Sequence, residues 1–324
     1  MERNVSLKNL CVLSFFAVTV GLCGCGKAAE MDYKYVFEDR LAQFEEIESD
    51  DFVTAFADSI CVLNGSSEEI VTLSADAAAV LDLDGGTAIY ERNALERMNP
   101  ASTTKIMTAI VALKYGNLAD MVTVTDDAII TESGSSMAGV VPGDQITLKD
   151  LLYGLMIPSG NDAANAIAVH VGGTIENFVS MMNAEAALIG ATGTHFVNAN
   201  GLTDPDHYTT AYDLYLMFRE ALKFDMFRTI IGTHAHTAEF TDADGNVKTA
   251  SWGVGNYYMN GKTETPEGLT VFGGKTGTTN AAGYCLVMGS VTDDGREYAS
   301  IIMKADSRND LYADMTNIIN KIDK

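Results

Sequence analysis

Cysteine, proline and basic residues are scarce in this sequence. Five cysteines among 324 residues are too few for a fold that depends on disulfides, and five prolines argue against a proline-rich linker protein. Lysine and arginine together number 21 against 44 aspartate and glutamate residues, so the net charge is −23. A surface of this charge repels phosphate backbones, and we therefore exclude nucleic acid as a partner.

Near the N-terminus, an apolar run is too short to span a bilayer as a helix. It covers residues 10–22 and has the length of a signal-peptide core. Arg3 and Lys8 precede it, as basic residues do in signal peptides. We predict that residues 1–24 are a signal peptide and that the protein is exported.

The end of this run has the sequence Leu22-Cys23-Gly24-Cys25, which resembles a bacterial lipobox. In that motif the last cysteine is lipidated and becomes the new N-terminus. The resemblance predicts that Cys25 carries the lipid and anchors the protein to the outer face of the cytoplasmic membrane. Ordinary cleavage near Ala28, without lipidation, is the alternative.

Acidic residues dominate the segment that follows. Between residues 30 and 70 only Lys34 and Arg40 oppose them. We interpret residues 25–75 as an acidic tether that holds the next domain off the membrane, while a solvated charged surface is the simpler explanation. Besides Cys25, this mature chain contains Cys61 and Cys285, which we expect to be buried free thiols because nothing in the sequence places them together.

From Asp76 onward the sequence has the patterning of a globular domain. Over the whole chain 47% of residues are apolar and 20% are charged, which is typical of folded proteins. The predicted strands cover residues 77–83, 87–90, 269–277, 283–291 and 297–304. The predicted helices cover residues 101–115, 148–156, 163–171, 176–188, 210–222 and a C-terminal segment from residue 311 to 322. Strands at both ends with helices between them predict an α/β sandwich whose sheet contains both ends of the domain.

A serine and a lysine lie three residues apart at the start of a very apolar predicted helix. Ser102 and Lys105 therefore share one helix face. A serine hydroxyl is a weak nucleophile unless a base removes its proton, and a lysine with a lowered pKa can be that base. A capping serine beside a surface lysine is the structural alternative.

Two further short motifs combine hydroxyl groups with an amide or a cation. Ser159-Gly160-Asn161 precedes a predicted helix, where a capping role is the simpler explanation. Lys275-Thr276-Gly277 ends an apolar strand, where Gly277 allows a substrate backbone to approach closely.

Each motif is common, but their order and spacing resemble the serine-type D-alanyl-D-alanine carboxypeptidases, the low-molecular-mass penicillin-binding proteins. Residues 151–168, 193–202, 207–214 and 273–287 carry the same resemblance, which extends from about residue 76 to the C-terminus. It implies one domain over residues 76–324 with the β-lactamase-like fold, a five-stranded antiparallel sheet with helices on both faces.

The resemblance also implies acyl transfer through a covalent intermediate. Ser102 attacks the carbonyl between the two terminal D-alanines of a peptidoglycan stem pentapeptide, and Lys105 accepts its proton. Ser159, bridging toward Lys275, passes a proton to the leaving D-alanine. The backbone N–H groups of Ser102 and Thr278 form the oxyanion hole. The implied substrate-binding residues are Asn161, Lys275, Thr276, Gly277, Thr278 and Arg308.

We expect penicillins to acylate Ser102 as inhibitors, and we expect neither a metal nor another cofactor. His234 and His236 share one face of a strand, but the sequence offers no third metal ligand. His207 is expected to have a structural role near the cleft.

Three other functions remain open. A class A β-lactamase needs a glutamate in an E-x-x-L-N pattern, which the sequence around Glu176 does not match. An endopeptidase of D-alanine cross-links and a non-catalytic sensor of cell wall or β-lactam are the others. Many family members continue into a second β-rich domain and a C-terminal anchor, for which the 47 residues after Gly277 leave no room.

Overall fold

The computed structural model describes Leu63, residues 72–84 and residues 87–323. The chain divides into two units, 1–56 and 57–324, and all described residues belong to the second. The predicted signal peptide, Cys25, Cys61 and most of the predicted tether lie outside the described residues.

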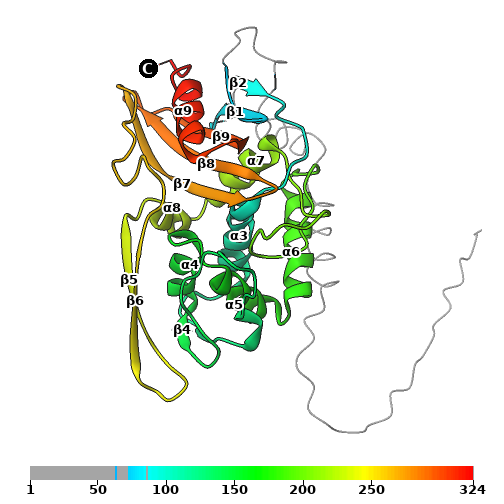
Figure 1. Cartoon of the computed structure of the whole chain (residues 1–324), viewed down its shortest axis with the longest axis vertical. Helices are drawn as coiled ribbons and strands as arrows, with labels where there is room; N and C mark the ends of the chain where they lie inside the picture. Colours follow the sequence, from blue (N-terminus) through cyan, green and yellow to red (C-terminus); the bar gives the residue numbers. More distant parts are fainter. Residues whose placement is uncertain (1–62, 64–71, 85–86, 324) are drawn as a thin grey trace, which may run out of the picture. The chain divides into compact units, whose positions relative to one another are not determined.

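An antiparallel sheet joins the two ends of the domain, as predicted from the strand patterns (Figure 1). Its strand order is β2-β1-β9-β8-β7, so the C-terminal strand β9 lies between the first strand and β8. The bounds are β1 (Ala77–Asp82), β2 (Ala88–Arg92), β7 (Leu269–Thr279), β8 (Gly283–Thr292) and β9 (Glu297–Ala305). The strand β7, which carries the third motif, is an edge strand.

Alternation along the strands gives the sheet two buried faces. In β1, Ala77, Ala79 and Leu81 face the larger core, whereas Ala78 and Val80 face the smaller one. Helix α9 (Arg308–Ile319) packs into the smaller core, and the other long helices build the larger one. Helices therefore cover both faces of the sheet, as the family resemblance implies.

The helices between the strands follow the predicted order. Threonine or serine N-caps begin several of them and accept a backbone N–H from the first turn, as in α4, α6, α7 and α9. The helices are α3 (Lys105–Tyr115), α4 (Leu148–Met156), α5 (Asn161–Gly172), α6 (Ile175–Leu188), α7 (Ala211–Ala221) and α8 (Asp225–Ile231). Helix α3 lies within the larger core, where eight consecutive residues from Lys105 to Ala112 are buried.

Two helix starts differ from the prediction in ways that matter for the motifs. The segment predicted as one helix over 101–115 begins as a 3₁₀ turn, η1 (Ala101–Thr104), and becomes α-helical at Lys105. Helix α5 begins at Asn161, two residues earlier than predicted, so Asn161 is a helical residue and not a loop residue.

The sequence analysis missed a second sheet and helix α8. This sheet has the order β3-β4-β5-β6, with strands β3 (Met121–Thr123), β4 (Gln145–Thr147), β5 (Ala235–Thr241) and β6 (Val247–Gly253). The first two strands are three residues long, and much of the β5–β6 hairpin is exposed and polar, so its hydrophobic pattern is weak. A second short 3₁₀ turn, η2, covers Asp126–Ala128.

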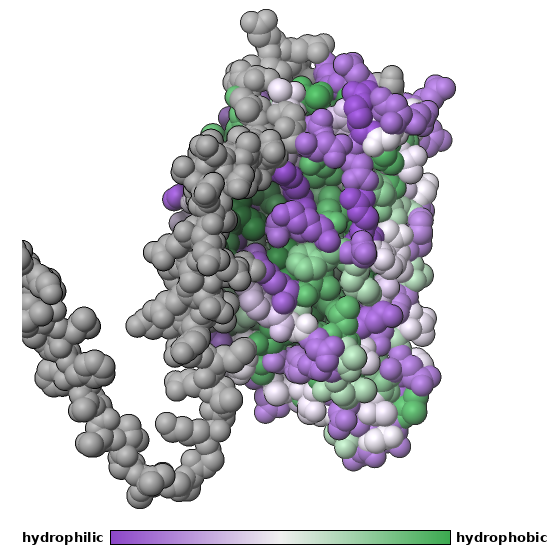
Figure 2. All heavy atoms as spheres, turned by 180° about the vertical axis from the view of Figure 1, so that it is seen from behind, coloured by the Kyte–Doolittle hydropathy of each residue, from purple (hydrophilic) through white to green (hydrophobic). Residues whose placement is uncertain are grey.

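Polar and apolar side chains are mixed over the described part of the face shown in Figure 2, which is typical of a protein surface in water. Within the described ranges, no helix has both the length and the apolar character needed to cross a membrane. Cys285 on β8 is buried and free, as expected for this thiol.

Candidate active site

The first motif lies where η1 meets α3, and its two side chains are in contact. Lys105 Nζ lies 2.9 Å from Ser102 Oγ, which confirms the shared face. The lysine is completely buried, whereas Ser102 is half-buried. The Lys105 amine also donates to Asn161 Oδ1 at 2.6 Å and to the backbone carbonyl of Asn200 at 2.5 Å. Three neutral oxygen atoms therefore surround this nitrogen.

This environment disfavours the charged form of Lys105. Burial is the main cause and the positive charge of Lys275 adds to it, so the pKa of Lys105 lies well below its ordinary value of 10.5. A neutral amine has two N–H groups and one lone pair. The carbonyl oxygens of Asn161 and Asn200 are suited to accept the two N–H groups, which directs the lone pair toward the Ser102 hydroxyl.

The second and third motifs meet each other in the same way. Lys275 Nζ on β7 donates to Ser159 Oγ at 2.9 Å and to the carbonyl of Thr276 at 2.7 Å. The Lys275 side chain is 2% exposed, and burial lowers its pKa to about 7. Two serine–lysine pairs thus come together from three distant parts of the chain.

Backbone strain is concentrated beside the two serines. Among the described residues only four other than glycine have positive φ, and they include Ala101 at 48° and Ser159 at 64°. Such conformations cost of order 1–3 kcal/mol each and persist only where surrounding contacts hold them. Ala101 directly precedes Ser102, and Ser159 is itself the serine that bonds to Lys275.

Gly277 permits a close approach between β7 and η1. A Cβ atom at this position would lie 3.0 Å from the carbonyl oxygen of Pro100 and 3.0 Å from the nitrogen of Ser102. The sequence analysis assigned this glycine to the approach of a substrate backbone. The contact that the structure displays is with the protein backbone around Ser102.

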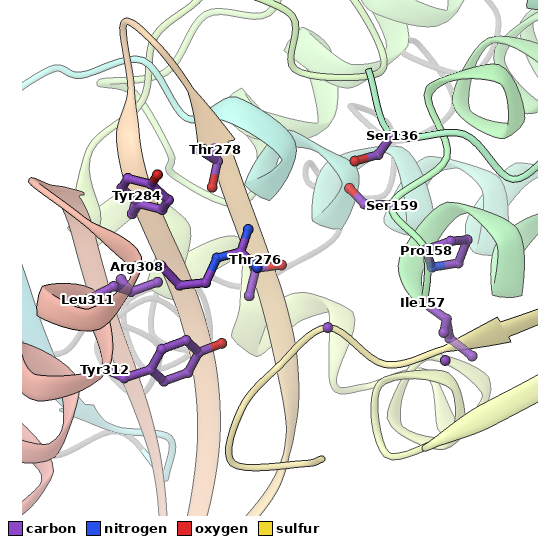
Figure 3. Close-up of a pocket in the computed structure, with 12 residues that line it drawn as sticks. Ser136, Ile157, Pro158, Ser159, Thr276, Thr278, Tyr284, Arg308, Leu311 and Tyr312 are labelled. Atoms are coloured by element: carbon purple, nitrogen blue, oxygen red, sulfur yellow. The ribbon is translucent and has the colours of Figure 1, made fainter. Parts of the chain in front are cut away.

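A pocket of about 220 Å³ opens beside these pairs. In Figure 3, Ser136 and Ser159 face Thr276 and Thr278 across it. Arg308, the first residue of α9, also lines the pocket, and its guanidinium lies 5.9 Å from the ring centre of Tyr257. No acidic side chain in the described part of the chain forms an ion pair with this arginine.

Ser102, Lys105 and Asn161 are not among the residues that line the pocket. Asn161 is buried, and its carboxamide oxygen is occupied by Lys105. The remaining wall of the pocket consists of small, apolar and aromatic residues. They are Ile157, Pro158, Gly253, Gly255, Tyr284, Leu311 and Tyr312.

Asp162 is a site-building residue that the sequence analysis missed. It is completely buried, and its carboxylate accepts backbone N–H groups from Ala138 at 2.7 Å, Gly139 at 2.7 Å and Val140 at 3.1 Å. It also accepts the N–H of Ala163 in its own helix. The carboxylate thereby holds the segment after Ser136 against the start of α5.

His207 is held next to η1 by hydrogen bonds on both ring nitrogens. Its Nδ1 accepts the backbone N–H of Val197 at 3.1 Å, which places the ring proton on Nε2. Nε2 lies 2.8 Å from Thr104 Oγ1. Burial lowers the pKa of His207 to about 4, so the ring is neutral near pH 7.

Of the two histidines that the sequence analysis placed on one strand, His236 lies on β5 and has a packing role, whereas His234 precedes this strand. His236 Nε2 donates to Asp150 Oδ1 at 2.8 Å, and the ring stacks on Tyr153 with a centroid distance of 3.8 Å. Over the described residues, no three histidine, cysteine or acidic side chains form a cluster able to hold a metal ion.

A family model described as D-alanyl-D-alanine carboxypeptidase, Peptidase S11, matches residues 64–307. D-alanyl-D-alanine carboxypeptidase DacF of Bacillus subtilis is 33% identical over 253 residues, which are 76% of this chain and 61% of that protein. D-alanyl-D-alanine carboxypeptidase of Streptomyces sp. strain K15 is 33% identical over 261 residues, which are 77% of this chain and 87% of the relative. The crystal structure of the Streptomyces K15 DD-transpeptidase matches with a TM-score of 0.72 and 31% identity, covering 78% of this chain and 98% of that one.

We expect Asp162→Asn to destabilise the protein by about 2–4 kcal/mol, because the amide N–H₂ would face backbone N–H groups that the carboxylate now accepts. Asp127→Asn is the control, since Asp127 is exposed and its carboxylate accepts the hydroxyl of Thr125 and no backbone N–H within the described residues. That change should cost less than about 0.5 kcal/mol. Urea unfolding of both variants measures the difference, and equal losses would contradict the assigned role of Asp162.

His207 predicts a pH dependence of stability. An unfolded histidine titrates near pH 6.5, whereas His207 in the folded protein titrates at about 4. Between these values the unfolded chain binds a proton that the folded protein does not, so the free energy of unfolding decreases as the pH falls from about 6.5 to about 4. His207→Gln cannot titrate there and should show a smaller decrease. Urea unfolding at several pH values tests this, and parallel curves for the two proteins would contradict it.

Proposed function

Because the chain belongs to the Peptidase S11 family of D-alanyl-D-alanine carboxypeptidases, we propose that it removes the terminal D-alanine from peptidoglycan stem pentapeptides. The reaction passes through an acyl-enzyme on Ser102. The observation that carries this proposal is the hydrogen bond between Ser102 Oγ and the buried amine of Lys105. It gives the serine a base with a lowered pKa within proton-transfer distance.

Acylation begins with the neutral form of Lys105. Its lone pair accepts the proton of Ser102, and Oγ bonds to the carbonyl carbon between the two terminal D-alanines. Negative charge then develops on the carbonyl oxygen, where backbone N–H groups of Ser102 and Thr278 stabilise it. The edge position of β7 supports this assignment, because alternate N–H groups of an edge strand have no neighbouring strand to bond.

Breakdown of the tetrahedral intermediate needs a proton on the leaving amine. Ser159 donates its hydroxyl proton to the nitrogen of the departing D-alanine and is reprotonated by Lys275, whose amine lies 2.9 Å away. The C–N bond breaks and an ester with Ser102 remains. The proton that Lys105 took from Ser102 returns through solvent to the neutral Lys275. Water then attacks the ester, and the neutral Lys105 accepts a proton from the water and returns it to Ser102.

The pocket supplies the recognition of the terminal carboxylate. Arg308, Thr276 and Thr278 line it together, and no carboxylate is among its lining residues. Arg308 provides the positive charge and the threonines provide hydroxyl donors. We assign Asn161 to the substrate amide, although its side-chain oxygen is bonded to Lys105, so only its N–H₂ group remains for a substrate carbonyl.

The same acyl-enzyme has other chemical fates. An amine acceptor in place of water gives transpeptidation, the activity in the name of the Streptomyces K15 structure. Fast hydrolysis of a penicilloyl ester would make the protein a β-lactamase. The sequence around Glu176 lacks the E-x-x-L-N pattern of class A β-lactamases, which favours slow release of penicillin.

We expect a fluorescent penicillin to label the protein covalently, and D-alanine to be released from a purified pentapeptide. Ser102→Ala should abolish labelling and lower release by at least about 10³-fold, because no acyl-enzyme forms. Ser180→Ala is the control, since Ser180 is exposed on α6 and bonds only within its helix. Unchanged labelling in Ser102→Ala would refute the assignment.

Other substrates separate the remaining functions. Cross-linked muropeptides cleaved faster than pentapeptides indicate an endopeptidase, and rapid turnover of nitrocefin indicates a β-lactamase. Labelling of Ser102 without any D-alanine release indicates a sensor. Each of these three outcomes would overturn the carboxypeptidase proposal.

We also propose that the protein is exported and held at the outer face of the cytoplasmic membrane by lipid on Cys25. In this proposal residues 1–24 are the signal peptide and residues 25–75 the acidic tether of a catalytic domain over residues 76–324. The lipobox-like sequence supports it.

Labelling of cells with a palmitate analogue tests the lipid anchor. The wild type should be labelled and Cys25→Ala should not, with release of the variant from the membrane fraction. Cys23→Ala is the matched control and should keep its label. A label that persists in Cys25→Ala would contradict lipidation at this residue.

A further inference from the structure

A chain of hydrogen bonds runs from His207 to the backbone directly before Ser102. His207 Nδ1 accepts the N–H of Val197, so Nε2 carries the ring proton and donates it to Thr104 Oγ1 at 2.8 Å. The Thr104 hydroxyl proton is then directed to the carbonyl of Ala101 at 2.8 Å. Every donor in this series of hydrogen bonds is directed toward the Ala101 carbonyl, so that each bond polarises the next one.

The last acceptor in this series of hydrogen bonds is the Ala101 carbonyl, which belongs to the same peptide unit as the Ser102 N–H. The peptide bond is planar and trans, so the Ala101 C=O and the Ser102 N–H point in opposite directions from one rigid plate. Fixing the carbonyl therefore fixes the direction of the N–H. In the described part of the chain, the Ser102 N–H donates to no protein acceptor, which leaves it available to a substrate.

This peptide unit needs external support. Ala101 has a φ of 48°, a conformation that residues other than glycine rarely adopt. Gly201 presses on the same carbonyl group, because a Cβ at this position would lie 2.0 Å from the Ala101 oxygen. The hydroxyl of Thr104 and the backbone at Gly201 thus hold the carbonyl from two segments of the chain.

We propose that Thr104 and His207 are positioning residues that hold the peptide unit between Ala101 and Ser102 with the Ser102 N–H directed at the developing oxyanion. This inference rests on the proposed acyl transfer at Ser102. Neither side chain touches the substrate. Thr104 holds the planar peptide unit through the Ala101 carbonyl, and His207 holds the Thr104 hydroxyl.

The neighbouring threonine offers a matched control. Thr103 is as deeply buried as Thr104, and its hydroxyl donates to the carbonyl of Pro100 at 2.7 Å. That carbonyl belongs to the preceding peptide unit and not to the one that contains the Ser102 N–H. Thr103→Val and Thr104→Val therefore remove the same group from the same turn, but only the second releases the oxyanion donor.

The first measurement is the rate constant of acylation by a fluorescent penicillin. Thr104→Val should lower it by about 10- to 100-fold, because a misdirected donor loses part of the stabilisation that an oxyanion-hole N–H provides. Thr103→Val should stay within about 3-fold of the wild type, and Thr104→Ser, which keeps the hydroxyl, should recover most of the rate. All rates are measured below the unfolding temperature of each variant.

Two substitutions of His207 test the direction of the hydrogen bond. The amide nitrogen of glutamine reaches about as far as Nε2, whereas asparagine ends near the position of Nδ1. His207→Gln should therefore acylate faster than His207→Asn. His195→Asn is the control, since His195 is exposed and bonds to the carbonyl of Asp206. In the double variant, His207→Asn should add less than about 2-fold to the effect of Thr104→Val.

The infrared band of the penicilloyl ester carbonyl reports on the oxyanion hole directly. Hydrogen bonds from the hole lower its frequency, so the band should move to higher frequency in Thr104→Val and stay in place in Thr103→Val. A general loss of stability does not produce this difference. Equal rates and equal bands in the two threonine variants would overturn the inference, and so would multiplicative effects of Thr104→Val and His207→Asn. Failure of penicillin to acylate the wild type would instead overturn the proposed function.

Discussion

The burial of two lysine amines among neutral oxygen atoms is the constraint on which the rest of the structure depends. Lys105 and Lys275 are almost completely buried, and no carboxylate in the described part of the chain pairs with either amine. A buried charge without a partner is costly, so the lysines respond with lowered pKa values. Each serine therefore has a neighbouring lysine whose pKa lies below its ordinary value and whose amine is within hydrogen-bond distance.

The fold holds this unfavourable arrangement by surrounding it with rigid elements. Ser102 lies in η1, and Lys105 begins helix α3 within the larger core. Lys275 belongs to an edge strand whose Gly277 lets it approach the backbone of η1. Asp162 holds the segment after Ser136 against the start of α5 through the backbone N–H groups of Ala138, Gly139 and Val140. The strained conformations at Ala101 and Ser159 are stable only within such a frame.

The net charge of the whole chain differs in sign from the charge that lines the pocket. A net charge of −23 opposes an anionic ligand in general, yet the pocket is lined by Arg308 and by no carboxylate. Local charge near the reacting groups decides binding at short range, since salt screens distant surface charges. An acidic protein can therefore bind a peptide carboxylate at a cationic pocket.

The family resemblance supplied the pairing of Ser159 with Lys275, whereas the sequence by itself determined the five-stranded sheet, most of the helices and the pairing of Ser102 with Lys105. Their signals are local, because residue spacing defines a helix face and alternation defines a strand. The second sheet and α8 escaped prediction, since short and polar strands have weak patterns. Only the tertiary structure decided that the Asn200 carbonyl holds Lys105, that Asp162 fixes the pocket wall and that His207 reaches Thr104. Backbone carbonyls have no sequence signature, and contacts such as that between residues 104 and 207 exist only when packing brings distant segments together.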